Sequence, residues 1–343
     1  MIRFNTKAYL KNLAQAPPGR FDYRKVLESG DWESWRQQFR SSLRERLGMH
    51  LIAPAGDLAP RRSETKEFPG YTLEKWYIAT EPDIEIPFYL LLPNSGKGPF
   101  PLVITPHGHG RRGKETYVGN FETEKERQDA LGGDRDIALQ AVAEGYAVIA
   151  PDVRGFWEMA REEDLDARKA NSCAELQRTA MMYGRTLIGE RVHDMGRLID
   201  YAQTRDEIDT GRIVITGNSG GGTVSLFTAA LDDRICIAVP GSYFCTFADS
   251  IVSITHCPCN IVPGILQLGE MYDVAGLIAP RPMLIVHGAQ DPIYPIEGTR
   301  KAFSHLQTIY RAMGYPDRCE LYEGDGGHRY YKNRVWSFVK EHL

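Results

Sequence analysis

The segment GNSGG at residues 217–221 places a hydroxyl nucleophile among glycines. It follows the apolar run RIVIT at residues 212–216 and precedes the helical pattern TVSLFTAAL. Glycines two residues to either side of Ser219 permit a tight strand-to-helix turn that lifts the serine oxygen above a sheet. A packing turn of the same composition is the alternative interpretation, but the strand before and the helix after favour Ser219 as a nucleophile.

A serine hydroxyl becomes reactive at neutral pH only beside a base, and that base needs an acid to hold its tautomer. His328 lies in a glycine-rich loop, EGDGGH, before the terminal helix, and Asp291 follows the apolar run PMLIV. Both residues follow Ser219 in the order Ser, Asp, His. We predict that His328 is the general base and acid and that Asp291 orients it. Asp325 is the alternative acid, because it lies only three residues before His328.

Acyl transfer also needs preorganised donors for the developing oxyanion. We predict two backbone N–H groups. One belongs to Gly220, at the start of the helix, and the other to His109, in the loop PHGHG after the strand PLVIT.

Two short motifs, HGH at residues 107–109 and HCPC at residues 256–259, offer metal ligands. No acidic or histidine partner follows at a spacing typical of a zinc site. We therefore expect no metal and no cofactor, and a packing role for the cysteines. A metal-dependent hydrolase or a metal-binding protein built on these motifs is the alternative from a different class.

Side chains just after strand ends are predicted to contact the substrate: Arg154, Trp157, Tyr243 and Phe244. For Arg154 an ion pair that braces the loops is the competing interpretation. Residues 246–272 intervene between two core strands and are predicted to form a lid or pocket wall.

The elements that position these residues follow from hydrophobic periodicity. Residues 71–80 and 84–92 predict an antiparallel strand pair with a turn between them. Short apolar runs predict a mostly parallel sheet buried on both faces: residues 101–105, 147–150, 212–216, 235–239 and 282–286, followed by a last short strand at 320–322. Helices are expected at residues 134–144, 189–203, 221–231, 299–313 and 330–341.

Before the strands, residues 31–47 carry apolar side chains at three- and four-residue steps, which predicts an amphipathic helix. We divide the chain into a helical extension, residues 1–69, and a catalytic domain, residues 70–343. Because such extensions often contribute to subunit interfaces, a homo-oligomer is one expectation.

Composition excludes several classes of protein. The 343 residues carry 41 Lys and Arg against 45 Asp and Glu, for a formal net charge of −4, and the charges are interspersed. Nucleic acid and anionic membranes are therefore poor partners. No run approaches the roughly 18 apolar residues of a membrane span, and the first residues lack a secretory pattern. The six cysteines show no regular interval. We expect a cytoplasmic protein with reduced thiols.

The motifs PHGHG, APDVRG, GNSGGG, HGAQDPIYP and GDGGH, in that order, resemble the α/β-hydrolase superfamily over about residues 70–343. Within it they are similar to the branch of dienelactone hydrolases and acetyl xylan esterases. Two departures stand out: dienelactone hydrolases use cysteine where this chain has Ser219, and glutamines of the best-known cephalosporin-deacetylating esterases are replaced by Gly220 and Phe156.

The resemblance implies an α/β-hydrolase fold and a serine esterase for short acyl groups. The expected substrate is a small-molecule or oligosaccharide ester, with acetyl groups on sugars as one case. A peptidase or amidase on the same fold is a second expectation, although the segment before residue 70 is too short for the gating domain of an oligopeptidase. A non-catalytic binding scaffold is a third.

Overall fold

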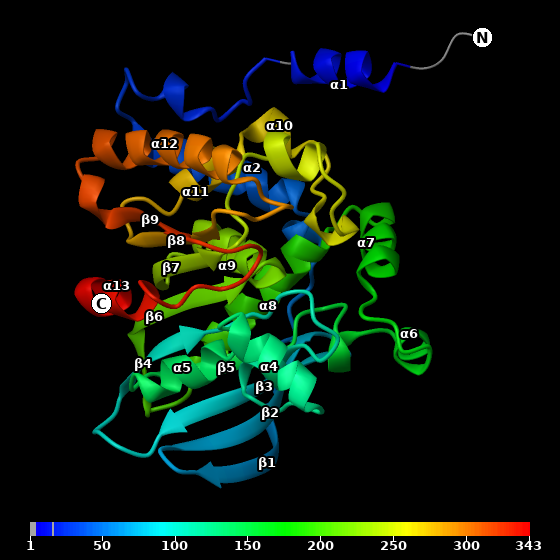
Figure 1. Ribbon diagram of the computed structural model, residues 1–343, viewed down its shortest axis with the longest axis vertical. Coiled ribbons are helices and arrows are strands. Elements are labelled where there is room, and N and C mark those ends of the chain that lie inside the picture. Colours follow the sequence, from blue (N-terminus) through cyan, green and yellow to red (C-terminus); the bar gives the residue numbers. More distant parts are fainter. Residues whose placement is uncertain (1–4, 16) are drawn as a thin grey trace.

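Short apolar segments form the centre of a sheet, as their composition predicts. The computed structural model describes residues 5–15 and 17–343, and in this part of the chain nine strands form one sheet in the order β1-β2-β3-β5-β4-β6-β7-β8-β9 (Figure 1). The strands are β1 (Arg61–Phe68), β2 (Tyr71–Glu81), β3 (Ile84–Pro93), β4 (Phe100–Ile104), β5 (Ala147–Pro151), β6 (Ile208–Asn218), β7 (Ile235–Gly241), β8 (Met283–Gly288) and β9 (Cys319–Gly324). Strands β4 to β9 are parallel, and β1, β2 and β3 extend the sheet in antiparallel pairing.

Every predicted strand is confirmed, and the structure adds β1, which the sequence analysis placed in the helical extension. Strand β1 (RRSETKEF) is exposed along nearly its whole length and contains no alternation of apolar and polar side chains. Charged edge strands protect a sheet from pairing with another chain, but they give no hydrophobic signal. The division of the chain at residue 69 stays a prediction.

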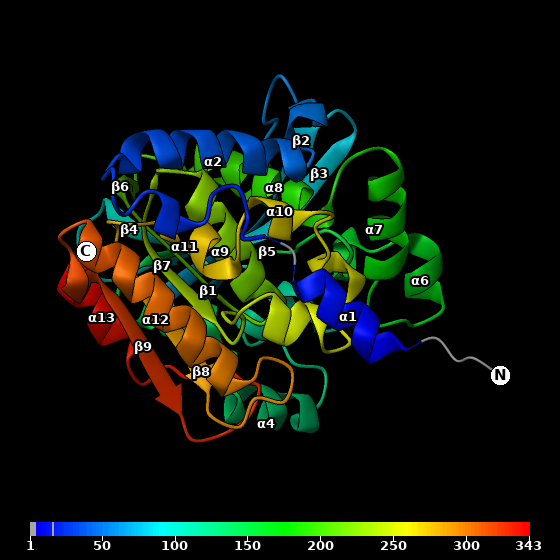
Figure 2. The same ribbon diagram turned by 90° about the horizontal axis from the view of Figure 1, so that it is seen from above.

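Helices cover both faces of the sheet (Figures 1 and 2). They are α1 (Thr6–Ala14), α2 (Trp32–Arg46), α3 (Lys114–Tyr117), α4 (Glu124–Gly132), α5 (Ile137–Ala143), α6 (Glu162–Asp166), α7 (Cys173–Met182), α8 (Leu187–Ala202), α9 (Gly220–Leu231), α10 (Ile265–Leu268), α11 (Met271–Gly276), α12 (Ile296–Ala312) and α13 (Val335–His342). The five helices predicted for the catalytic domain are confirmed, with α13 beginning five residues later than expected.

The core is divided by the sheet into two hydrophobic clusters. Leu102 and Ile104 of β4 face the cluster formed with α8, α9, α11 and α12, whereas Val103 faces the cluster formed with α5 and α13. This alternation follows from the two-residue period of a strand. Because both faces are covered, the chemistry-bearing loops are left at the carboxyl ends of the parallel strands.

The predicted amphipathic helix is α2, which lies outside α9 and α11 (Figure 2). Its apolar stripe of Trp35, Phe39 and Leu43 is buried in the larger core cluster. The chain leaves the helix at Gly48, whose φ of 72° is in the left-handed region that glycine tolerates. The prediction that this helix packs on the main domain is confirmed.

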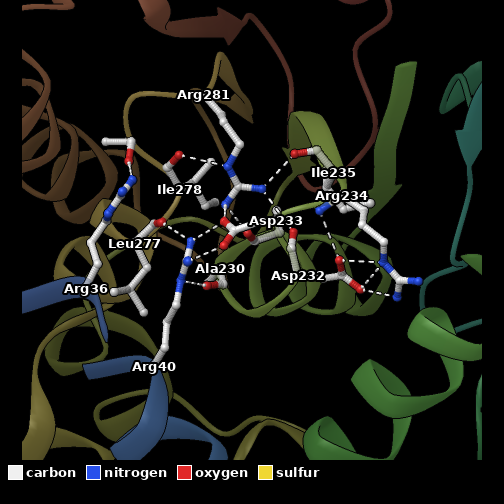
Figure 3. Close-up of polar contacts among 12 residues, drawn as sticks. Arg36, Arg40, Ala230, Asp232, Asp233, Arg234, Ile235, Leu277, Ile278 and Arg281 are labelled. Carbon is white, nitrogen blue, oxygen red and sulfur yellow. Dashed lines mark hydrogen bonds and ion pairs between the residues drawn. The ribbon is translucent and has the colours of Figure 1, made fainter. Parts of the chain in front are cut away.

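Arginines hold α2 against the end of α9 (Figure 3). Arg40 forms a forked contact with Asp233, at 2.5 and 2.6 Å, and donates to the carbonyl oxygens of Ala230 and Leu277. Arg281 donates to the carbonyl of Ala229 from the opposite side. Cations at a helix C-terminus satisfy its free carbonyls and oppose its negative dipole end. The docking of α2 thus also caps the helix that carries the elbow.

In the described part of the chain, no helix combines the length and the apolar character needed to cross a bilayer.

Candidate functional site

Ser219 forms the turn between β6 and α9, with φ 58° and ψ −118°. Its backbone N–H donates to the carbonyl of Gly241 at 2.8 Å, which holds this strained conformation. A Cβ atom at Gly217 or Gly221 would meet the carbonyl oxygen of Pro106 at 2.2 or 2.0 Å. Glycine at both positions therefore lets the loop after β4 lie directly against the turn, as expected for a nucleophile elbow.

The three side chains predicted to act together do meet. Nε2 of His328 lies 2.8 Å from Oγ of Ser219, and Nδ1 lies 2.7 Å from Oδ2 of Asp291. Ser219 follows β6, Asp291 follows β8 and His328 follows β9. These strands are parallel, with β7 between β6 and β8, so their carboxyl ends bring the three groups to the same end of the sheet. A neutral imidazole in this arrangement donates from Nδ1 to the carboxylate and accepts at Nε2 from the hydroxyl.

Asp291 is buried and held as a carboxylate. Its Oδ1 atom accepts from the backbone N–H groups of Ile293 and Tyr294, both at 3.0 Å. Burial opposes ionisation, but the hydrogen bond and charge of His328, together with these two N–H donors, outweigh it and lower the pKa of Asp291. The competing acid, Asp325, has an exposed side chain, and Asp291 is the carboxylate that contacts His328.

The two predicted oxyanion donors lie on neighbouring segments. Gly220 is the first residue of α9, where backbone N–H groups are free of helical partners. A Cβ atom at Gly220 would lie 2.9 Å from Nδ1 of His109, and one at Gly108 would lie 2.5 Å from the carbonyl oxygen of Asn218. The loop that carries His109 thus abuts the elbow, while the roles of both N–H groups stay predictions.

A cavity of about 280 Å³ opens beside Ser219 and His328. Its wall combines polar and apolar groups and includes Asn218, Arg135 and Asn260, none of which the sequence analysis selected. Among the described residues, the buried Oδ1 atom of Asn218 has no hydrogen-bond partner. Its place beside Ser219 in the elbow was a signal available in the sequence, whereas nothing local marked Arg135 or Asn260.

The side chains predicted to contact substrate are directed elsewhere, because a position after a strand end does not fix which way a side chain points. Arg154 is buried in ion pairs with Asp194 and Glu81, at 2.7 and 2.6 Å, which is the bracing role considered as the alternative. Tyr243 and Phe244 are fully buried in the core. None of these three lines the cavity.

Trp157, the fourth predicted contact, is also absent from the cavity wall and lies under the guanidinium of Arg112. The predicted wall segment does contribute, because Thr255, His256 and Cys257 line the cavity. Whether residues 246–272 move as a lid stays a prediction.

The three histidines of the two motifs do not form one ligand group. Nε2 of His107 accepts from the backbone N–H of Val153 at 3.1 Å, and His256 contacts the hydroxyl of Ser250 at 2.9 Å. His109 alone turns toward the cysteines, where its Nε2 atom lies 3.3 Å from Sγ of Cys259.

Sequence reasoning expected no metal centre here, yet the structure gathers four potential metal ligands: His109, Cys173, Cys257 and Cys259. Cys173 was missed because it is far from both motifs along the chain. No local pattern could have joined it to them.

Comparison with known proteins identifies a family and a protein of similar sequence. A family model described as the Abhydrolase family matches residues 6–330. YtaP of Bacillus subtilis (strain 168), which carries a provisional hydrolase name, is 28% identical over 251 residues, covering 71% of this chain and 77% of its own.

Solved structures share the fold. A protein of Bacteroides fragilis NCTC 9343 with a provisional acetyl xylan esterase name has a TM-score of 0.77 at 19% identity, over 94% of this chain and 83% of its own. A methylesterase has a TM-score of 0.67 at 23% identity, over 97% of this chain and 66% of its own. These matches confirm the predicted fold class.

Proposed function

The chain belongs to the Abhydrolase family, and on that premise we propose that it hydrolyses carboxylic esters through an acyl intermediate on Ser219. One observation carries the proposal: the continuous contact from the Ser219 hydroxyl through His328 to Asp291, at 2.8 and 2.7 Å, beside a cavity. Nucleophile, base and orienting acid at these distances are the parts that acyl transfer requires.

The chemistry follows from the atoms in contact. Nε2 of His328 takes the proton of the Ser219 hydroxyl as Oγ attacks the ester carbonyl carbon, and the carbonyl oxygen becomes an oxyanion. The backbone N–H groups of Gly220 and His109 are proposed to hold that oxyanion. His328 then gives its proton to the leaving alcohol. A water molecule, deprotonated by the same imidazole, releases the acid and restores the hydroxyl.

Asp291 stabilises the imidazolium that forms in each half of the reaction. Its lowered pKa keeps it ionised at neutral pH, so the carboxylate can hold Nδ1–H of His328 and fix the tautomer.

The size of the cavity favours a small ester. Its volume of about 280 Å³ is just below the range of pockets that hold drug-sized ligands, roughly 300 to 1,000 Å³. The amide side chains of Asn218 and Asn260 belong to the cavity lining, and amide groups can form hydrogen bonds with sugar hydroxyl groups. We propose short acyl groups, with acetyl esters of oligosaccharides as the leading class. The provisional acetyl xylan esterase name of one similar structure supports this choice, whereas another is named a methylesterase.

The test uses p-nitrophenyl acetate together with a serine-directed fluorophosphonate. The wild-type protein is expected to turn over the ester and to be labelled once, at Ser219. Ser219→Ala is expected to abolish labelling and to lower kcat by at least about ten-thousand-fold. Ser225→Ala, which alters a buried hydroxyl bonded within α9, is the matched control for folding. Esterase activity that survives Ser219→Ala would contradict the proposal.

Acyl length is tested separately with p-nitrophenyl acetate, butyrate and octanoate, and with acetylated xylo-oligosaccharides. We expect kcat/KM to fall as the acyl chain lengthens, because the cavity is too small to hold a long acyl chain. A preference for octanoate would overturn the assignment to short acyl groups while leaving the serine mechanism intact. Cleavage of an amide faster than its matched ester would favour the peptidase alternative.

A further inference from the structure

Four ligand atoms from three separate segments converge at the edge of the cavity. They are Nε2 of His109 after β4, Sγ of Cys173 at the start of α7, and Sγ of Cys257 and Cys259 in the segment between β7 and α10. All four atoms lie within 4.8 Å of one another. Cys173 and Cys259 are buried, and the group includes every cysteine of the HCPC motif.

The spacing fits a tetrahedral metal centre. Zinc binds thiolate sulfur at about 2.3 Å and imidazole nitrogen at about 2.0–2.1 Å, so tetrahedral ligands lie roughly 3.6–3.8 Å apart. Sγ of Cys259 lies 3.3 Å from Nε2 of His109 and 3.3 Å from Sγ of Cys257. Shifts of about 1 Å in the more distant ligand atoms would bring all four to the spacing of a tetrahedral zinc ion. A disulfide would need two of these sulfurs at about 2.05 Å instead.

A buried cation beside the cluster points independently to negative charge there. Arg191 is 2% exposed, and among the described residues it forms no ion pair with a carboxylate. Its guanidinium donates to Sγ of Cys173 at 3.4 Å and to the carbonyl oxygen of Arg154. A charged side chain so deeply buried requires a counter-charge. Neutral thiols do not supply one.

Three thiolates around a divalent cation carry one net negative charge, which the guanidinium of Arg191 balances. Cys173 is the first residue of α7, at the positive end of the helix dipole, which favours a metal-bound thiolate at this position.

We propose that His109, Cys173, Cys257 and Cys259 bind one zinc ion. Soft thiolate sulfur with one imidazole is a donor set that zinc prefers over magnesium or calcium. Four protein ligands complete a tetrahedron and leave no position for water or substrate, so this centre positions the chain and does not activate water. The metal-dependent hydrolase considered from the sequence is not what these ligands would build.

The ion would fix one wall of the cavity. Its ligands join the loop that carries His109 to the wall segment that contains Cys257, and both residues line the cavity beside Ser219. Binding of zinc would hold the backbone of His109 next to the elbow, where an oxyanion donor is proposed. We therefore expect metal loss to loosen the site without removing any of Ser219, His328 or Asp291.

The first experiment measures zinc per chain by mass spectrometry of the elements, after purification under reducing conditions, reconstitution with zinc and dialysis. The wild-type protein is expected to retain about one zinc per chain. Cys173→Ser and Cys259→Ser are expected to lower retained zinc at least about tenfold. Cys236→Ser is the matched control, because Cys236 lies at the far end of β7 and contacts the carbonyl of Gly211. Circular dichroism checks that each variant folds.

The second experiment needs no variant. Cobalt(II) is added to metal-free wild-type protein, and tetrahedral thiolate ligation is expected to give visible d–d bands with sulfur-to-cobalt charge transfer in the near ultraviolet. A thiol count with and without zinc is expected to show three cysteines protected by the metal. Wild-type protein that retains no zinc, a colourless cobalt complex, or a disulfide between Cys257 and Cys259 as the isolated form would each overturn the proposal. These readouts are independent of ester hydrolysis.

Discussion

Nδ1 of His328 lies 2.7 Å from Oδ2 of Asp291, although 37 positions separate the two residues along the chain. Strands β8 and β9 pair in parallel so that Gly288 lies opposite Gly324. The loops that carry the two side chains therefore leave the sheet at the same level. The ring of His328 is also stacked near Tyr294, at 5.8 Å between centroids, which limits its rotation away from the carboxylate.

Asp291→Asn is predicted to lower kcat about ten-thousand-fold, because an amide in place of the carboxylate holds the wrong imidazole tautomer and does not stabilise the imidazolium. The matched change Asp325→Asn removes the carboxylate that lies three residues before His328 and is predicted to leave kcat within a few-fold of wild type. Steady-state kinetics with p-nitrophenyl acetate distinguishes the two variants. Equal losses in both would return Asp325 to the site.

The free energy of unfolding is predicted to depend on pH through Asp291. Its pKa in the folded protein lies below the value of about 3.9 in an unfolded chain, so its contribution is fully present above that value and is lost as pH falls through the folded pKa. The difference in the free energy of unfolding between wild type and Asp291→Asn, measured in urea, should therefore be largest above about pH 5 and should shrink as pH falls below about 4. A difference that stays constant over this range would contradict the prediction.

Lys114→Met is predicted to destabilise the protein by about 3–5 kcal/mol, because it leaves a buried carboxylate without its counter-charge. Lys114 and Asp152 both have fully buried side chains, joined at 2.6 Å. Lys340→Met, which removes an exposed lysine paired with Glu144, is the matched control and should cost less than about 1 kcal/mol. Urea unfolding measures both. Similar costs for the two variants would show that the buried pair is not maintained in solution.

The docking of α2 is tested by a double-mutant cycle on Arg40 and Asp233. Asp233 is 67% exposed on its side chain, so the coupling between the two charges should be at most about 1 kcal/mol. Arg40→Ala should cost more than Asp233→Ala, because it also removes donors from the carbonyls of Ala230 and Leu277, at about 1 kcal/mol each. Chemical unfolding of the four proteins gives the cycle. Equal single-variant costs would assign the docking energy to the ion pair alone.

Local patterns were sufficient for much of this molecule. Short apolar runs predict the parallel strands because a strand buried on both faces has nowhere to place polar side chains. The elbow around Ser219 was also legible, since glycine is needed where the chain turns sharply against the loop at Pro106. Strand β1 was missed because an exposed, charged edge has no such pattern.

Tertiary structure decided what depends on direction and on distant partners. Arg154, Tyr243 and Phe244 stand at the strand ends, but packing turned the arginine toward carboxylates and the two aromatic rings into the core. Likewise, nothing near Cys173 in the chain marks it as a neighbour of His109. Periodicity and turn chemistry act over a few residues and can be read from the sequence. The direction of a side chain and the neighbours of a thiol are set by contacts between segments far apart in the chain. Such contacts exist only once the sheet and its helices have packed.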